Sequence, residues 1–218
     1  MRVYTLDSKG VLSAIVMGAV VLLLGSYAGA YFLFLLLLFL LLSAIVTDIG
    51  IWKKKQMGQY EHARGWKNVL ANGGVAVIVS FLFFLNTFLS FMPAKDLIIV
   101  YAASISGITA DKFASEIGVL DGSPVMLLTF EKVKKGTSGG VTGLGTLASF
   151  FGALIIAMML PIVGIGARGM AIVAISGFLG NIVDSLLGYF EEKGVGNKFT
   201  SNFACAAASS LIAYFLLV

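Results

Sequence analysis

The stretch Tyr31-Phe-Leu-Phe-Leu-Leu-Leu-Leu-Phe-Leu-Leu-Leu-Ser-Ala-Ile-Val46 decides the fold class of this protein. It contains no charged residue, and its neighbours extend it into a mostly apolar segment, residues 30–50. An α-helix needs about 20 mostly apolar residues to cross the hydrocarbon core of a bilayer. The segment therefore predicts a transmembrane helix.

Six further stretches have a similar length and composition. The seven predicted spans are residues 11–27, 30–50, 69–91, 97–115, 141–163, 169–190 and 200–218. The first span resembles the apolar part of a signal peptide, but another span follows at once, so we interpret it as an uncleaved helix. The sequence thus predicts an all-α polytopic membrane protein with about seven transmembrane helices, in which residues 1–218 form a single integral membrane domain.

The composition of the whole chain supports this prediction. Of the 218 residues, 59% are hydrophobic and 12% are charged, whereas a soluble domain carries about 25% charged residues. A soluble enzyme, a disordered protein and a nucleic-acid-binding protein are therefore excluded. The single cysteine, Cys205, allows no intrachain disulfide and is expected to be a packing residue. The single histidine, His62, is expected to be solvated in a polar loop.

The basic residues indicate how the chain is oriented, because Lys and Arg favour the cytoplasmic side. With a cytoplasmic N-terminus, only Lys95 and Arg168 lie outside. The thirteen inside are Arg2, Lys9, Lys53, Lys54, Lys55, Arg64, Lys67, Lys112, Lys132, Lys134, Lys135, Lys193 and Lys198. The asymmetry also favours an odd number of spans. Apart from orientation, the run Lys53-Lys54-Lys55 is expected only to contact anionic lipid.

Three carboxylates stand near the predicted cytoplasmic ends of the spans: Asp111, Glu116 and Asp184. Charged side chains within spans are costly and usually functional. Two carboxylates at one place repel each other unless a cation lies between them. Mg²⁺ is the natural choice, because it takes oxygen ligands and is usually held by carboxylates and substrate phosphates. The alternative is that each carboxylate pairs with a lysine or caps a helix.

The two aspartates lie in similar local patterns, Gly107-Ile-Thr-Ala-Asp111-Lys-Phe-Ala-Ser115 and Gly180-Asn-Ile-Val-Asp184-Ser-Leu-Leu-Gly188. The spacing places glycine, aspartate and the last small residue on one helix face. A glycine pair precedes each pattern, at Gly73-Gly74 and at Gly139-Gly140. These features predict a parallel duplication of a two-helix unit, spans three and four with spans five and six, although so short a match also arises by coincidence.

A glycine-rich stretch, Lys135-Gly136-Thr137-Ser138-Gly139-Gly140, precedes the fifth span. Glycines allow close backbone approach to a ligand, and the first N–H groups of a helix bind anions. The stretch is not a Walker A motif, because the order Gly-x4-Gly-Lys-Ser/Thr is missing. With two carboxylates at the same membrane depth, it predicts a phosphate site. Without those carboxylates, the stretch would indicate only the capped start of a helix.

Asparagines near the same level complete the candidate site. We expect Asn72 and Asn202 to contact the ligand, whereas Asn68, Asn181 and Asn197 are assigned no role. The alternative for every buried asparagine is a hydrogen bond between helices.

The candidate site residues lie in stretches that resemble those of a known family. The chain resembles the integral membrane family that includes plant phytyl-phosphate kinase and human transmembrane protein 19. The matching stretches, in the family's order, are Arg64-x7-Ala71-Asn72-Gly73-Gly74, Ala110-Asp111-x3-Ser115-Glu116-Ile117-Gly118, Lys135-Gly136-Thr137-Ser138-Gly139-Gly140-Val141-Thr142-x2-Gly145-Thr146, and Asp184-Ser185-Leu186-Leu187-Gly188 followed by Asn202.

The resemblance implies a CTP-dependent, or another NTP-dependent, kinase that converts an isoprenyl monophosphate into its diphosphate at the cytoplasmic membrane face. Asp111, Glu116 and Asp184 would hold Mg²⁺, and Asp111, Asp184 and Lys135 would be the catalytic residues. The backbone of residues 136–140, with Asn72 and Asn202, would bind the nucleotide. The implied partners are the nucleotide, the isoprenyl-phosphate lipid and membrane lipid, with no nucleic acid.

Two departures from the family pattern leave the nucleotide and the acceptor open. Lys112 stands where many members have Thr, and the segment between Gly188 and Asn202 is shorter than in eukaryotic members. The alternative functions are a related lipid cytidylyltransferase, a polyprenol kinase, or a transporter of a small solute or ion. Transporter sites usually lie near the membrane midplane, whereas these acidic residues gather at one face.

Overall fold

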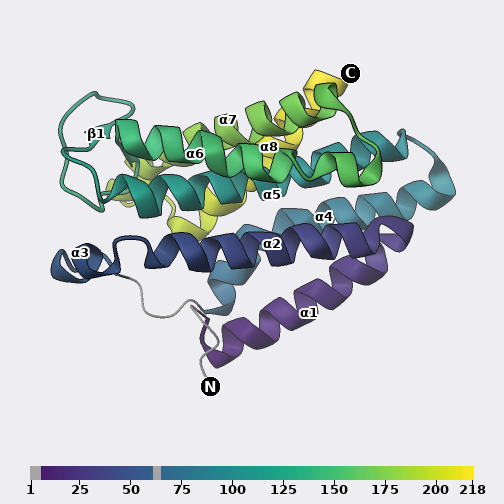
Figure 1. Ribbon diagram of the computed structural model, residues 1–218, viewed down its shortest axis with the longest axis horizontal. Helices are drawn as coiled ribbons and strands as arrows, with labels where there is room; N and C mark the ends of the chain where they lie inside the picture. Colours follow the sequence, from purple (N-terminus) through teal and green to yellow (C-terminus); the bar gives the residue numbers. More distant parts are fainter. Residues whose placement is uncertain (1–5, 61–64) are drawn as a thin grey trace.

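Apolar helices running roughly alongside one another make up most of the structure, a computed structural model that describes residues 6–60 and 65–218 (Figure 1). The predicted position of His62 lies outside the described residues. The elements in chain order are α1 (Ser8–Leu24), the 3₁₀ turn η1 (Ser26–Ala28), α2 (Gly29–Asp48), α3 (Ile51–Gln56), α4 (Trp66–Leu89), α5 (Ala94–Gly118), β1 (Val125–Met126), β2 (Gly140–Val141), α6 (Gly143–Ala157), the 3₁₀ turn η2 (Leu160–Val163), α7 (Ala167–Glu192) and α8 (Lys198–Leu217).

The number of spans agrees with the prediction of about seven. Within the described residues, six helices are long and apolar enough to cross a membrane when η1 and η2 are counted with their neighbours. A shorter apolar helix, α1, has 17 residues. At 1.5 Å per residue it rises about 26 Å, close to the 30 Å hydrocarbon core. The all-α polytopic membrane fold is therefore confirmed.

The predicted boundaries are nearly correct for every span except the fifth. The predicted helix over residues 141–163 starts later, at Gly143, because Gly140 and Val141 belong to strand β2. It is also interrupted, since α6 ends at Ala157 and η2 carries Pro161 near its start. Proline has no N–H to donate to a helical hydrogen bond, which fits the change from α to 3₁₀ geometry.

Helix α5 forms the centre of the bundle. In its most apolar window 89% of residues are buried, against 39–44% in the other five long spans, and it packs on α2, α4, α6, α7 and α8. Small residues allow this close packing: a Cβ on Gly177 of α7 would clash with the Ser106 side chain. The Ser106 hydroxyl lies within hydrogen-bond distance of Val173 O and Ala153 O, which ties α5 to α6 and α7.

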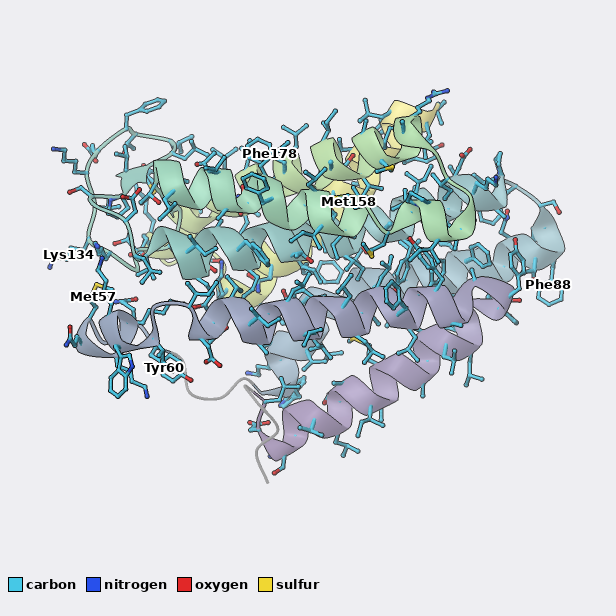
Figure 2. The ribbon with its side chains drawn as sticks, in the orientation of Figure 1. Met57, Tyr60, Phe88, Lys134, Met158 and Phe178 are labelled. Atoms are coloured by element: carbon cyan, nitrogen blue, oxygen red, sulfur yellow. The ribbon has the colours of Figure 1, made fainter. Side chains whose placement is uncertain are left out.

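Two ends of the bundle can be distinguished. Helix α3 and the hairpin formed by β1 and β2 lie at one end, and the connection between α4 and α5 lies at the other (Figure 1). Tyr60 and Lys134 mark the first end and Phe88 the second (Figure 2). The first end is the predicted cytoplasmic face, and that orientation stays a prediction.

Candidate functional site

A polar cleft of about 480 Å³ opens at the end of the bundle that carries the hairpin. Helices α4, α5, α7 and α8 and the hairpin segment contribute to its lining. All the predicted site residues line it, namely Asn72, Asp111, Glu116, Lys135, Gly136, Thr137, Ser138, Gly139, Gly140, Asp184 and Asn202. The tertiary structure therefore gathers residues from five separate parts of the chain around one cavity.

Asp111 of α5 and Asp184 of α7 lie near the same lysine. Lys198, the first residue of α8, donates a hydrogen bond of 3.0 Å from Nζ to Asp184 Oδ2. The same Nζ lies 3.8 Å from Asp111 Oδ1. Both aspartates are buried, with exposed fractions of 8% and 4%. The structure thus brings the two predicted carboxylates together, and it also contains the lysine pairing that the sequence left as an alternative.

Two glycines allow the aspartate-bearing helices to approach α8. A Cβ added to Gly107 of α5 or to Gly180 of α7 would clash with the Ser209 hydroxyl of α8. Each glycine lies four residues before its aspartate, so the two similar patterns pack on one residue of α8. The glycine pairs do not correspond, because Gly73-Gly74 lies in α4 and Gly139-Gly140 in the hairpin. The duplication itself stays a prediction.

A chain of three asparagine amides leads from α4 into the cleft. Asn72 Nδ2 donates to the backbone carbonyl of Asn68 at 2.8 Å, and Asn202 Nδ2 donates to Asn72 Oδ1 at 3.3 Å. The backbone carbonyl oxygen of Asn68 can only accept a hydrogen bond. The side of the Asn72 amide that faces it must therefore be the NH₂ group. The Asn72 oxygen consequently faces Asn202, and Asn202 turns its NH₂ toward Asn72 and keeps its own oxygen available.

Of seven buried side-chain oxygens that have no hydrogen-bond partner among the described residues, three belong to residues of the polar cleft: Oδ1 of Asn181, Asp184 and Asn202. Buried polar atoms are nearly always hydrogen-bonded in native proteins, so each exception needs an explanation. A set of carboxylate and amide oxygens is the donor set that a hard divalent cation prefers, and it would equally accept hydrogen bonds from a ligand.

Glu116 lies with lysines rather than with the two aspartates. Its Oε2 accepts a 2.7 Å hydrogen bond from Lys54 Nζ, its Oε1 accepts one from Thr47, and Lys112 also pairs with it. Within the described residues, no group of three or more His, Cys, Asp and Glu side chains is placed to hold a metal ion. The predicted set of Asp111, Glu116 and Asp184 is not such a group: Lys54 and Lys112 pair with Glu116, and Lys198 lies near the two aspartates.

Lys54 is expected to be a main stabilising residue of the ion-pair network around Glu116. Its ammonium is fully buried and also donates to Val46 O and Thr47 O at the end of α2. Lys54→Met leaves Glu116 with one lysine fewer and two carbonyls without their donor, so we expect a loss of about 2 kcal/mol of stability. Thermal unfolding of the purified protein measures it. Lys55→Met, at an exposed position, is the matched control, and equal melting temperatures for the two variants would contradict this role.

The glycine-rich stretch lies in the hairpin and packs on the end of α7. Ser138 N–H donates to Glu192 Oε1 at 2.8 Å, and Ser138 Oγ donates to Glu191 Oε2 at 2.5 Å. At Gly139, where φ is +76°, a Cβ would lie 2.5 Å from the carbonyl oxygen of Ser185. The stretch precedes the fifth span as expected, but strand β2 separates it from the start of α6 at Gly143. Its glycines serve close backbone packing against α7.

The start of α6 is capped separately. Thr142 Oγ1 accepts from Gly145 N–H, and Asp121 Oδ2 accepts from Leu144 N–H. Hydrogen bonds from the backbone of Gly122 and Leu144 hold the pKa of Asp121 below its usual value. These two side chains accept hydrogen bonds from N–H groups in the first turn of α6. The predicted anion cradle is the backbone of residues 136–140, and it stays a prediction.

Sequence reasoning missed several residues of the cleft. Lys198 was counted only for orientation, yet it pairs with Asp184 and approaches Asp111. Asn181 precedes Asp184 by three residues, a spacing that places both on one helix face and could have revealed it. Asn197 caps α8, where its side chain accepts from the N–H groups of Phe199 and Thr200. That cap starts the helix at Lys198.

Comparison of the sequence with known proteins shows which proteins this chain is similar to. Over 216 residues the chain is 36% identical to an uncharacterized membrane protein of Methanocaldococcus jannaschii, which covers 95% of this chain and 84% of that protein. Over 201 residues it is 31% identical to Protein PGR of Arabidopsis thaliana, covering 81% and 70% of the two chains. No solved structure matches. The model of the integral membrane protein family DUF92 matches residues 1–211, and the chain belongs to that family.

Proposed function

We propose that this protein is a Mg²⁺-dependent phosphotransferase that moves the γ-phosphoryl group of CTP, or of another nucleoside triphosphate, onto an isoprenyl monophosphate. The carrying observation is the group of buried oxygens without described partners, Oδ1 of Asn181, Asp184 and Asn202, in one cleft with Asp111 and Lys198. The resemblance of the sequence motifs to phytyl-phosphate kinase supplies the substrate class.

The residues of the cleft fit a bound magnesium ion. Asp111 and Asp184 would hold it, with amide oxygens of Asn181 and Asn202 as further ligands, and Glu116 would support Lys112 beside it. Bound Mg²⁺ neutralises phosphate charge and orients the transferred group.

Other residues of the cleft would handle the phosphates and the acceptor. Lys135 of the hairpin and Lys198 of α8 line the cleft, where their cations would contact phosphate oxygens. An acceptor that is itself a phosphate is already a nucleophile, so the reaction needs positioning and charge neutralisation more than a strong general base. The position of the cleft at one end of the bundle suits a lipid whose phosphate emerges at the membrane face.

The test is direct transfer of label. Purified protein in nanodiscs is incubated with Mg²⁺, geranylgeranyl monophosphate and CTP or ATP labelled at the γ-phosphate. We expect label in the lipid diphosphate and release of CDP or ADP. In a parallel incubation with CTP labelled at the α-phosphate, label in the lipid with release of inorganic diphosphate would instead identify a cytidylyltransferase. Labelling of free geranylgeraniol would identify a polyprenol kinase. No labelled lipid with any of the four common nucleoside triphosphates would overturn the proposal.

A further inference from the structure

A second hollow, the apolar groove, lies between α1, α2 and α4. It encloses about 60 Å³, and its walls include Ala14 and Gly18 of α1 and Leu36 and Leu40 of α2. Most of the side chains that line it are apolar, so hydrocarbon is its natural occupant. The polar cleft described above does not include these four residues.

The apolar groove and the polar cleft meet. Phe39, Asn68 and Asn72 line both of them. Asn72 is the middle member of the amide chain whose last member, Asn202, lines the polar cleft. A ligand that filled both hollows would therefore have an anionic end near Lys198 and an apolar end against α1 and α2. That description fits an amphiphile with a phosphate headgroup.

Small and flexible side chains keep the groove adaptable. A Cβ on Gly73 of α4 would clash with the Met17 thioether, so α1 packs closely on α4 at this point. Methionine side chains adjust easily to neighbouring groups. Helix α1 lies at the edge of the bundle (Figure 1), and its outward residues Leu12 and Ile15 are more than 60% exposed. A lipid could thus reach the groove from the bilayer beside α1.

We propose that the apolar groove binds the hydrocarbon next to the phosphate of the acceptor lipid, while the remainder of the chain stays in the bilayer. This inference rests on the proposed function, because it names the place of the same acceptor. The size of the groove sets the limit: a cavity of about 150 Å³ holds one benzene molecule, so 60 Å³ holds only the first few carbons. Acceptors that share the first isoprene unit should therefore bind alike whatever their length.

Ala14→Phe fills the groove and tests the proposal. We expect the KM for geranylgeranyl monophosphate to rise at least about tenfold, since several apolar carbons lose their burial. The KM for the nucleotide should stay unchanged. Ile15→Phe places the same ring on the adjacent, lipid-facing position and should behave like the parent protein. Active parent protein together with an unchanged lipid KM in Ala14→Phe would overturn the groove and leave the kinase intact.

Two further measurements keep the proposal testable. If Ala14→Phe does not fold, Leu40→Ala enlarges the groove instead and should improve turnover of an acceptor phosphate that carries a bulky aryl group near its phosphate. Without any kinase activity, a geranylgeranyl monophosphate with a photoreactive diazirine on its first isoprene unit reports binding alone. Crosslinks to α1, α2 or α4 support the groove, and crosslinks confined to other helices reject it.

Discussion

Asp184→Asn and Asp111→Asn are each expected to lower Mg²⁺-dependent phosphoryl transfer by at least about 100-fold. Even the loss of a group that only supports a metal ligand typically costs 10- to 100-fold in metal affinity or activity, and these two residues would be ligands themselves. Asparagine keeps the shape of the side chain and removes its charge. In Asp184→Asn, one of the two terminal positions also changes from an acceptor to a donor next to Lys198.

Asp48→Asn is the matched control, because Asp48 is an exposed carboxylate at the end of α2. It should retain the activity of the parent protein. Binding of Mn²⁺, measured by electron paramagnetic resonance in the presence of a non-hydrolysable nucleotide, provides a readout besides turnover and should weaken only in the two cleft variants. Full turnover in both Asp111→Asn and Asp184→Asn would remove the metal site from the proposal.

Gly139→Ala and Gly188→Ala form the second prediction, and both should lower the activity at least about tenfold. A Cβ on Gly139 would lie 2.5 Å from Ser185 O and 2.8 Å from Tyr189 N, and a Cβ on Gly188 would lie 2.5 Å from Gly139 Cα. Backbone atoms cannot move aside as a side chain can, so the hairpin must lift from α7. Lys135, four residues before Gly139, would then lose its place in the cleft.

Gly143→Ala provides the control for these two variants. No heavy atom lies within 4 Å of a Cβ at Gly143, and the residue is the first of α6, where alanine is a better helix former than glycine. It should be as active as the parent protein. Trypsin cleavage after Lys134 or Lys135, compared between the variants, reports whether the hairpin has lifted. Unchanged cleavage and unchanged turnover in Gly139→Ala would contradict the role of this contact.

Comparing Gly139→Ala with Gly188→Ala also separates the effect of close packing from that of backbone strain. Gly139 has a positive φ of +76°, so alanine there is strained as well as crowded. Gly188 lies inside α7 and has no positive φ, so alanine there acts through the clash alone. Similar losses in both variants would assign the effect to the contact between the hairpin and α7.

The positions of the membrane-spanning helices follow from the amino-acid sequence alone. A segment such as residues 31–46 must satisfy its backbone hydrogen bonds internally when hydrocarbon surrounds it, and this requirement is local, so hydropathy and length suffice to predict it. The same reasoning identified Asp111 and Asp184 as candidate site residues, because a charge within a span is costly wherever the helix packs. The fifth span was less well predicted, since the pairing of Gly140 and Val141 with β1 is not visible in hydropathy.

Which side chains meet depends on how the helices pack against one another. Glu116 pairs with Lys54, which lies 62 residues earlier in the chain. Ser138 of the hairpin hydrogen-bonds to glutamates more than 50 residues further along the chain. Lys198 gave no sign of its role beyond its charge. Such partners depend on how helices rotate and pack around α5, where small residues such as Gly107 permit close approach. Packing of this kind couples positions far apart in the chain, whereas hydropathy reports on each segment separately.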